Sequence, residues 1–422
     1  MATILLILMV VLMLVGLPIY LSIGVPTALY FLIENPTLML MLPQRMCAGA
    51  DSFPLLAIPF FILCGEVMNA GGLTDRLFGF ARKIIGFIPG GLGFANVVAS
   101  CLFASMSGSA VADTAGLGRI EMQAMEEAGY DRDFSIGITV ASSTIGPIIP
   151  PSINMVLYGA MAGASTSALF IGGVVPGILM GLLMCVLVYI ISRKRNYPTD
   201  PVPKLIPLLS SFKDAVLALF TPVIIIGGMM SGIFTATEAS MVACLYSLFI
   251  CALVYRQLTW KGLLDAARQT IHSTGTIMLI IAVASAFSYM LSLEQIPQKL
   301  SYWILGLSTN TNVIWLLLIV LFLIIGCFME VSSAIIVLTP ILLPAVKMLG
   351  FDLVHFGVVM VLALGVGLIT PPMGMCLYVG ANVSNLPLSK VIRATAPYII
   401  PITIVVLLCT YCPSLILWPS IG

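Results

Sequence analysis

Long apolar segments dominate this chain and restrict what it can fold into. About a dozen such segments follow one another, several of them interrupted, and a helix needs roughly 20 apolar residues to cross a bilayer. Of the 422 residues, 60% are hydrophobic and 8% are charged, whereas soluble domains carry about 25% charged residues. The sequence therefore predicts an all-α polytopic membrane protein.

Charge and motif content argue against several other classes. The net charge of +1 gives no reason to expect a nucleic-acid partner. The two histidines, His272 and His355, form no HExxH motif, and no Walker motif is present. Cys409 and Cys412 form a CxxC, but no βαβ context or second metal-ligand pair accompanies it. We therefore expect that the chain is not an enzyme.

One hydrophilic connector, residues 192–214, lies near the middle of the chain. Its basic residues are Arg193, Lys194, Arg195, Lys204 and Lys213. Basic loops are retained on the cytoplasmic side of a membrane, so we expect this connector there. The connector divides the chain into a first half, residues 1–191, and a second half, residues 215–422.

The two halves contain a repeat. The first half reads SSTIGPIIPPSINMVLYGA, and the second reads GVGLITPPMGMCLYVGA. Pairing Pro150 with Pro371 gives an offset of 371 − 150 = 221 residues. The same offset aligns other positions, among them Gly146 with Gly367 and Ser109 with Glu330. Two halves with a Gly/Pro-broken apolar segment at the same place predict a secondary transporter, in which such repeats are often inverted.

Each half carries a polar tip followed by a proline break. The tips are expected near residues 105–109 and 326–333, and the breaks at residues 146–154 and 367–375. A polar tip between two apolar arms predicts a re-entrant hairpin, which is tolerated at membrane depth only when it is buried or lines a cavity. Because proline has no N–H group, carbonyl oxygens in the breaks lose their helical partners.

The breaks have two interpretations. Free carbonyls and hydroxyls form a hard-oxygen environment that suits a small cation, and Na⁺ is coordinated in this way in transporters. The alternative is a structural kink whose oxygens are satisfied by Ser, Thr or water. Asp113 follows the first tip, Glu330 lies in the second and Glu66 lies in an earlier apolar segment; each could bind an ion, carry a proton or pair with a base. Asn154 and Asn382 could bind substrate or a neighbouring helix.

Residues 258–273, LTWKGLLDAARQTIHS, show a different pattern. Apolar residues recur at helical spacing and polar residues fill the other face. This pattern predicts an interfacial helix on the membrane surface, with a helix in a cytoplasmic loop as the alternative.

Several motifs resemble one transporter family. In order, SMSGSAVADTAG, SSTIGPIIPPSI, GCFME and GLITPPMGM resemble the large, DctM-like membrane subunit of tripartite ATP-independent periplasmic (TRAP) transporters, within the ion-transporter superfamily. The resemblance covers nearly the whole chain. It implies an elevator fold with a scaffold part and a mobile transport part, built from two inverted repeats. Each repeat would contribute one re-entrant hairpin and one broken helix, in a multi-pass protein of the bacterial inner membrane.

The resemblance also implies the binding residues. The first Na⁺ site would comprise Ser105, Ser107, Ser109, Gly146, Ile149 and Pro150. The second would comprise Gly326, Phe328, Glu330, Gly367, Thr370 and Met373. The substrate would lie between the tips, near Ser107, Gly108, Ser152, Asn154, Ser332 and Asn382.

The implied function is sodium-coupled uptake of a carboxylate, of the sialic acid or C4-dicarboxylate type, and the sequence resembles the sialic-acid branch. A periplasmic binding protein would deliver the substrate. We also expect a separate small four-helix, DctQ-like membrane subunit, because this sequence contains none. The alternative is a proton-coupled organic-anion transporter, or a channel, that uses Glu330 and Asp113.

Overall fold

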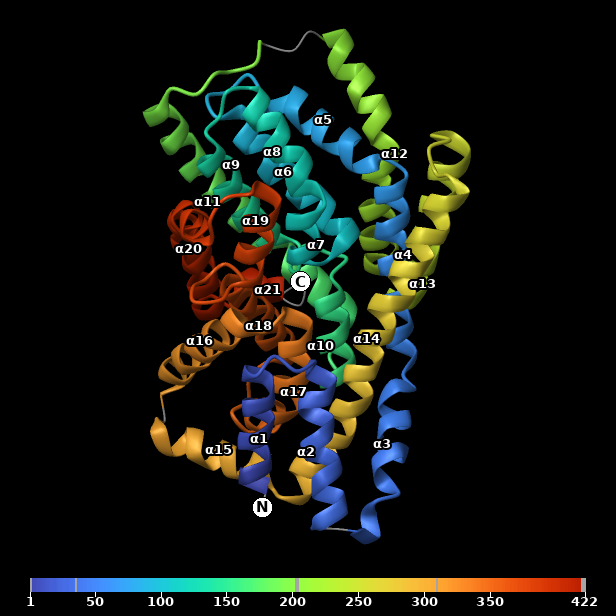
Figure 1. The fold of residues 1–422 in the computed structure, drawn as a ribbon, viewed down its shortest axis with the longest axis vertical. Helices are drawn as coiled ribbons and strands as arrows, with labels where there is room; N and C mark the ends of the chain where they lie inside the picture. Colours follow the sequence, from blue (N-terminus) through green and yellow to red (C-terminus); the bar gives the residue numbers. More distant parts are fainter. Residues whose placement is uncertain (1, 35, 202–204, 309, 419–422) are drawn as a thin grey trace.

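The structure, a computed structural model, describes residues 2–34, 36–201, 205–308 and 310–418. Every regular element within these residues is helical (Figure 1). Eight of the described helices are long and apolar enough to cross a membrane. The prediction of an all-α polytopic membrane protein is thereby confirmed.

The helices fall into four consecutive groups. The chain starts with α1 (Ala2–Leu14), α2 (Ile19–Ile33), η1 (Pro36–Leu38), α3 (Met41–Ala50), η2 (Phe53–Leu56), α4 (Ala57–Ala70) and α5 (Leu73–Ile85). The first hairpin and broken helix comprise α6 (Gly91–Ser107), α7 (Ala110–Ala115), α8 (Leu117–Glu127), α9 (Arg132–Ser142), η3 (Ser143–Ile145) and α10 (Ile153–Ala162). The central group is α11 (Thr166–Arg195), α12 (Leu205–Met230), α13 (Ala236–Phe249), η4 (Ile250–Val254), α14 (Trp260–Leu293) and α15 (Ile296–Leu307). The second hairpin and broken helix are α16 (Thr311–Phe328), α17 (Val331–Met348), α18 (Leu353–Gly367) and α19 (Met375–Ser384), followed by α20 (Leu388–Tyr411) and α21 (Ser414–Leu417).

The two hairpin units match at the offset found in the sequence. α9 begins at Arg132 and α18 at Leu353, which are 353 − 132 = 221 residues apart. Ser109 is the N-cap of α7, and Glu330, at the matched position, is the N-cap of α17. In Figure 1 the first broken helix descends from α9 to α10, whereas the second rises from α18 to α19. The units therefore run in opposite directions, as inverted repeats do.

The two units also interlock. α6 packs against α9, and α16 packs against α18, so each hairpin lies on the first half of its own broken helix. In contrast, α10 packs against α17 and α19 packs against α7, so each second half reaches the hairpin of the other unit. This exchange brings both breaks and both tips to the centre of the molecule (Figure 1).

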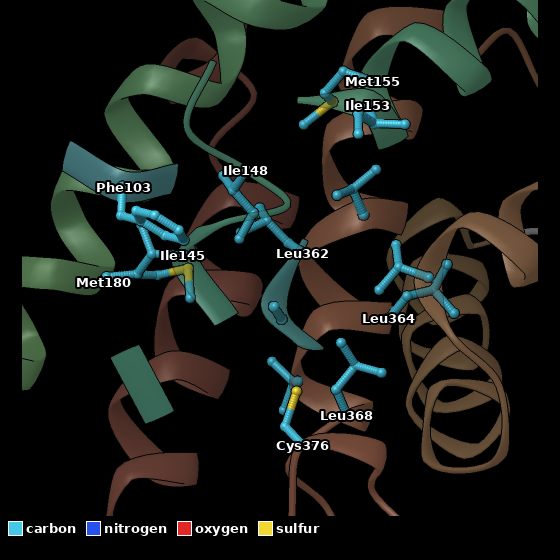
Figure 2. Close-up of a cluster of buried hydrophobic side chains, with 14 of the residues drawn as sticks. Phe103, Ile145, Ile148, Ile153, Met155, Met180, Leu362, Leu364, Leu368 and Cys376 are labelled. Carbon is cyan, nitrogen blue, oxygen red and sulfur yellow. The ribbon is translucent and has the colours of Figure 1, made fainter. Parts of the chain in front are cut away.

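One apolar core joins the two breaks. Figure 2 shows Ile148 of the first break, with Ile145 just before it, in the same cluster as Leu368 of the second break and Leu364 of α18, all of them buried. Because lipid is as apolar as these side chains, close packing rather than exclusion of water holds such a core together. The breaks are thus set in a packed environment rather than in a loose loop.

The segment at residues 258–273 is not a separate interfacial helix. It forms the first half of α14, which runs without interruption from Trp260 to Leu293. The hydroxyl of Thr259 caps the start of this helix by accepting a hydrogen bond from the Gly262 N–H at 3.0 Å. No proline follows before Leu293, so nothing in the local sequence ends the helix near Ser273.

The connector is shorter than the predicted residues 192–214. α11 extends to Arg195, and α12 already begins at Leu205. Within the described part of the connector, the ring of Tyr197 stacks on that of Tyr130 with centroids 4.6 Å apart. This stack fastens the connector to the turn between α8 and α9.

Candidate functional site

The first tip lies against both ends of the first break. A Cβ atom at Gly146 would lie 3.5 Å from the carbonyl carbon of Ser109. A Cβ atom at Gly108, which has a φ of +59°, would lie 3.1 Å from the Ile153 nitrogen and 3.4 Å from the Pro151 oxygen. Glycine at the tip therefore permits a backbone approach that a larger residue would obstruct.

The first break contains backbone oxygens without hydrogen bonds. Its three prolines have no N–H group to donate, and no backbone N–H of the described residues outside the regular helices donates to the carbonyl oxygens of Gly146, Ile149 or Pro150. Buried carbonyls normally have partners. Ser105 and Ser107 end helix α6, but their side chains lie outside the described structure.

The Ser152 side chain caps the start of α10. Its hydroxyl donates to the carbonyl oxygen of Pro147 and accepts a hydrogen bond from the Met155 N–H at 3.3 Å. The side chain is fully buried. The structure therefore does not bring Ser152 to the candidate substrate site.

The second tip and the second break touch through their backbones. A Cβ atom at Gly326 would lie 2.5 Å from the Leu364 oxygen, and one at Gly367 would lie 2.8 Å from the Cys327 nitrogen. The Gly374 N–H donates to the Cys327 oxygen at 2.9 Å. Gly326 and Gly367 thus occupy positions where no side chain fits, which explains why both are glycines.

The second break differs from the first in exposure. Phe328 and Met373 expose 44% and 48% of their surfaces, whereas Pro150 in the first break is buried. The hydroxyl of Thr370 donates to the Val366 oxygen at 2.8 Å, which leaves its lone pairs available to a cation. The structure thus shows one closed break and one open break.

Asn154 connects the two repeat units. Its Nδ2 donates to the Gly108 oxygen at 3.4 Å, and its Oδ1 accepts a hydrogen bond from the Ser332 hydroxyl at 2.8 Å. The same hydroxyl lies 3.2 Å from Glu330 Oε1. Glu330 in turn accepts hydrogen bonds from the N–H groups of Ser332 and Ser333, at 2.8 and 3.3 Å. Tip 1, break 1 and tip 2 therefore share one polar network.

Both tips open onto one cavity of about 640 Å³. The tips contribute Gly108, Ser109, Glu330, Ser332 and Ser333 to its wall. Helices α4 and α14 contribute Glu66, Asn69, Gln269, His272, Ser273 and Thr276. Asn154 lies one layer behind this wall, and Asn382 is exposed on α19 away from it.

The sequence reasoning missed the polar residues of α14. Gln269, His272, Ser273 and Thr276 follow one another at intervals of three, one and three residues, which places them on one helix face. This polar stripe in a mostly apolar helix was the available signal. The predicted interfacial helix at residues 258–273 includes part of this stripe.

The described wall of the cavity is acidic. It carries two carboxyl groups, Glu66 and Glu330, and no Lys or Arg. An anion that enters this cavity meets like charges, which repel it strongly away from water. The cavity can therefore accept an anion only together with a cation or with protons on these groups.

A buried polar network lies behind the first tip. Asn96 Nδ2 donates to Glu121 Oε2 and to Thr139 Oγ1, each at 2.7 Å, and Ser142 donates to Asn96 Oδ1 at 2.8 Å. Asp113 is 2% exposed, and its Oδ2 has no partner within the described residues. Asp113 does not line the cavity. The structure therefore does not place Asp113 and Glu330 on one cavity wall.

Comparison with known protein families identifies the family of this chain. The family model described as "Tripartite ATP-independent periplasmic transporter, DctM component" matches residues 6–415. The chain belongs to the DctM family of TRAP transporters. Because this is a family of transporter permeases, the prediction that the chain is not an enzyme is confirmed.

Two curated relatives match almost the whole length of this chain. The large permease protein SiaM of a sialic acid TRAP transporter from Vibrio cholerae is 41% identical over 399 residues, which are 94% of this chain and 93% of SiaM. The large permease protein DctM of a C4-dicarboxylate TRAP transporter from Pseudomonas aeruginosa is 40% identical over 397 residues, covering 93% of this chain and 92% of that protein.

A solved structure supports the fold of this chain. The crystal structure of the Alcanivorax borkumensis YdaH transporter, described as having an unusual topology, matches with a TM-score of 0.64. The match covers 99% of this chain and 98% of the YdaH chain, at 15% sequence identity. At this identity the likeness shows the fold alone.

Proposed function

We propose that this DctM-family chain is the large membrane subunit of a sodium-coupled importer of a carboxylate in the bacterial inner membrane. One observation carries the proposal. Two hairpin tips, each in contact with a proline break, open onto a single cavity whose polar wall is acidic. A carboxylate can occupy such a cavity if cations enter with it or if its acids are protonated, and the two tip–break contacts favour cations.

Two Na⁺ ions would bind where the tips meet the breaks. The first would use the unpaired oxygens of Gly146, Ile149 and Pro150 together with hydroxyls of Ser105, Ser107 and Ser109. The second would use Gly326, Gly367, Thr370 and the tip residues up to Glu330, with Phe328 and Met373 contributing only backbone oxygens. Na⁺ binding would neutralise part of the negative charge beside the substrate, and substrate binding would therefore depend on Na⁺ binding.

The substrate would be a carboxylate of the sialic acid or C4-dicarboxylate type, because relatives named for each are similarly close. Gly108 and Ser332 line the cavity, and we infer that they contact the substrate. Asn154 would position Ser332. Ser152 and Asn382 face elsewhere and are not part of the proposed substrate contacts.

An elevator movement would carry this site across the membrane. The two interlocked units would form the mobile part, while α2, α3, α4, α13 and α14 would form the scaffold. In support, α14 packs against α2, α3 and α4, and the cavity lies between α4, α14 and the tips. A periplasmic binding protein would deliver the substrate, and a small four-helix membrane subunit would complete the transporter.

Uptake by proteoliposomes tests the proposal. The chain is reconstituted with its small subunit and binding protein, and radiolabelled N-acetylneuraminate and succinate are offered under an inward Na⁺ gradient. We expect uptake of one of them that collapses when choline replaces Na⁺. Uptake driven equally well by a pH gradient without Na⁺ would instead support proton coupling.

Proton coupling is the second candidate, and one observation favours it. Asp113 is buried with an unpartnered carboxylate oxygen among the described residues, which is how a proton-carrying acid can look. The variants Thr370→Ala and Asp113→Asn separate the two candidates. Sodium coupling predicts that Thr370→Ala raises the Na⁺ concentration needed for half-maximal uptake, while Asp113→Asn leaves the response to pH unchanged.

A further inference from the structure

A second cavity, of about 520 Å³, is separate from the substrate cavity. It is formed by the start of α9, the end of α11 and the first turns of α20, and it shares no lining residue with the cavity at the tips. Four cationic side chains line it: Arg132, Arg195, Lys390 and Arg393. Much of the remaining wall is apolar, including Phe134, Ile191 and Pro397.

The charges of this wall do not cancel. Asp131 and Asp133 are its acids, so the lining carries four positive and two negative charges, and Arg132 pairs with Glu126 outside the lining at 3.1 Å. Both acids pair with Arg195, at 2.9 and 3.2 Å. Lys390 and Arg393 form no ion pair with any described residue. Two cations therefore remain for an anion from outside.

Tyr398 adds a buried donor to the same wall. Its side chain is 1% exposed, and its hydroxyl has no hydrogen-bond partner among the described residues. A buried hydroxyl without a partner is unfavourable. The Tyr398 hydroxyl would donate a hydrogen bond to an anionic oxygen in the cavity, and Lys390 and Arg393 would balance the negative charge.

We propose that this cavity binds a phosphate group, held by Tyr398, Lys390 and Arg393. Phosphate offers several acceptor oxygens to these donors, and arginine and lysine both bind it. The apolar part of the wall suits an attached hydrocarbon chain. The end of α11 carries Arg193, Lys194 and Arg195, which indicates the cytoplasmic side. Basic pockets between helices on that side bind headgroups of anionic lipids, and a soluble phosphate ester is the other source.

Because the cavity joins α9, α11 and α20, an occupied site would brace the first half of the first broken helix against its neighbours. This role does not depend on which substrate is transported or on which ion drives it.

Lipid titration of the purified full chain with its small subunit tests the proposal. The protein in neutral detergent receives phosphatidylglycerol, phosphatidylcholine or inorganic phosphate, and thermal unfolding and native mass spectrometry are recorded. We expect phosphatidylglycerol to raise the unfolding temperature by several degrees and to remain bound in the gas phase, and phosphatidylcholine to do neither. The same shift with inorganic phosphate alone would assign the site to a soluble phosphate ester.

Matched variants locate the effect. Lys390→Gln/Arg393→Gln should abolish the shift, and Tyr398→Phe should reduce it while leaving the ring packing intact. Lys261→Gln/Arg268→Gln removes two exposed cations from α14, outside the cavity, and should retain the shift. An equal shift in the Lys390/Arg393 variant and the wild type, or an equal loss in the α14 variant, would overturn the proposal.

Discussion

The hydroxyl of Ser332 donates to the side-chain oxygen of Asn154 across 2.8 Å, although the two residues are 178 positions apart in the chain. Ser332 lies in the first turn of α17, at the end of the second tip, and Asn154 lies in the first turn of α10, at the end of the first break. This bond is a direct polar contact between the two repeat units, just behind the cavity wall. It makes the position of one tip depend on the position of the other.

Removing this bond should impair transport more than stability. We expect Asn154→Ala and Ser332→Ala each to lower uptake about tenfold, which corresponds to roughly 1.4 kcal/mol. Because both variants break the same bond, the double variant should lose little more than either single one. Initial uptake rates in proteoliposomes measure this. Asn382→Ala is the control, since Asn382 is exposed on α19, and it should keep near wild-type uptake. Fully additive losses would show that the bond does not couple the tips.

Pro150→Ala should partly restore helical hydrogen bonding across the first break. Alanine at this position supplies an N–H four residues after Gly146, whose carbonyl oxygen has no hydrogen bond from the described residues. A helical bond to that oxygen would withdraw it from the ion. We expect a rise of about tenfold in the Na⁺ concentration for half-maximal uptake, with only a small drop in unfolding temperature. Pro176→Ala changes a proline inside α11 and should leave the Na⁺ dependence unchanged. Equal loss of uptake and stability at Pro150 would favour a structural kink.

Gly367→Ala should separate the second tip from the second break. The new Cβ atom would lie 2.8 Å from the Cys327 nitrogen, where backbone atoms cannot yield easily. Overpacking of this kind costs about 1–3 kcal/mol. Gly365→Ala, two residues earlier in α18, would meet only the Thr144 oxygen at 3.8 Å and should be neutral. Thermal unfolding with and without Na⁺ checks both variants. If Gly367→Ala kept full stability and Na⁺ response, the close backbone contact would have no functional role.

Asp131 should make stability depend on pH below about pH 4. The hydrogen bond from the Tyr197 hydroxyl, at 2.7 Å, and the pairing with Arg195 lower the pKa of Asp131 below its ordinary value. Because the folded pKa is the lower one, this stabilisation is present above the unfolded pKa and is lost as pH falls through the folded pKa.

Tyr197→Phe tests this linkage. The variant should unfold at a lower temperature than the wild type at pH 7, and the difference should shrink as the pH drops below about 4. Unfolding temperatures measured across this pH range show the convergence. Tyr189→Phe, on the exposed surface of α11, should show no such pH dependence. A difference for Tyr197→Phe that stays constant with pH would mean that Asp131 is not involved.

The broken helices and the re-entrant hairpins were predictable from local chemistry. Single prolines such as Pro176 lie inside continuous helices, whereas Pro150 and Pro371 each begin a Pro-Pro pair a few residues after a glycine, and there the helices break. The internal repeat was also detectable in the sequence, because the offset that aligns Ser109 with Glu330 depends only on residue order. For the same reason the first polar tip was placed correctly near Ser109, the N-cap of α7.

The polar stripe on α14 shows why other parts of the site were not predictable. Gln269 and His272 fit the polar face of a surface helix as well as a cavity wall, because helical spacing does not say what the face meets. The hydroxyl of Ser152 likewise stands beside the break in the sequence, yet it turns to the Pro147 oxygen in the fold.

The sequence by itself determined that the chain crosses a membrane, that it repeats, and where its helices break, since these properties follow from residue type and order. Only the tertiary structure decided which elements meet. The exchange of α10 onto α17 and of α19 onto α7 places Asn154 beside Ser332 and assembles two tips and α14 around one cavity. Such contacts depend on close packing between segments far apart in the chain, and no local pattern specifies that packing.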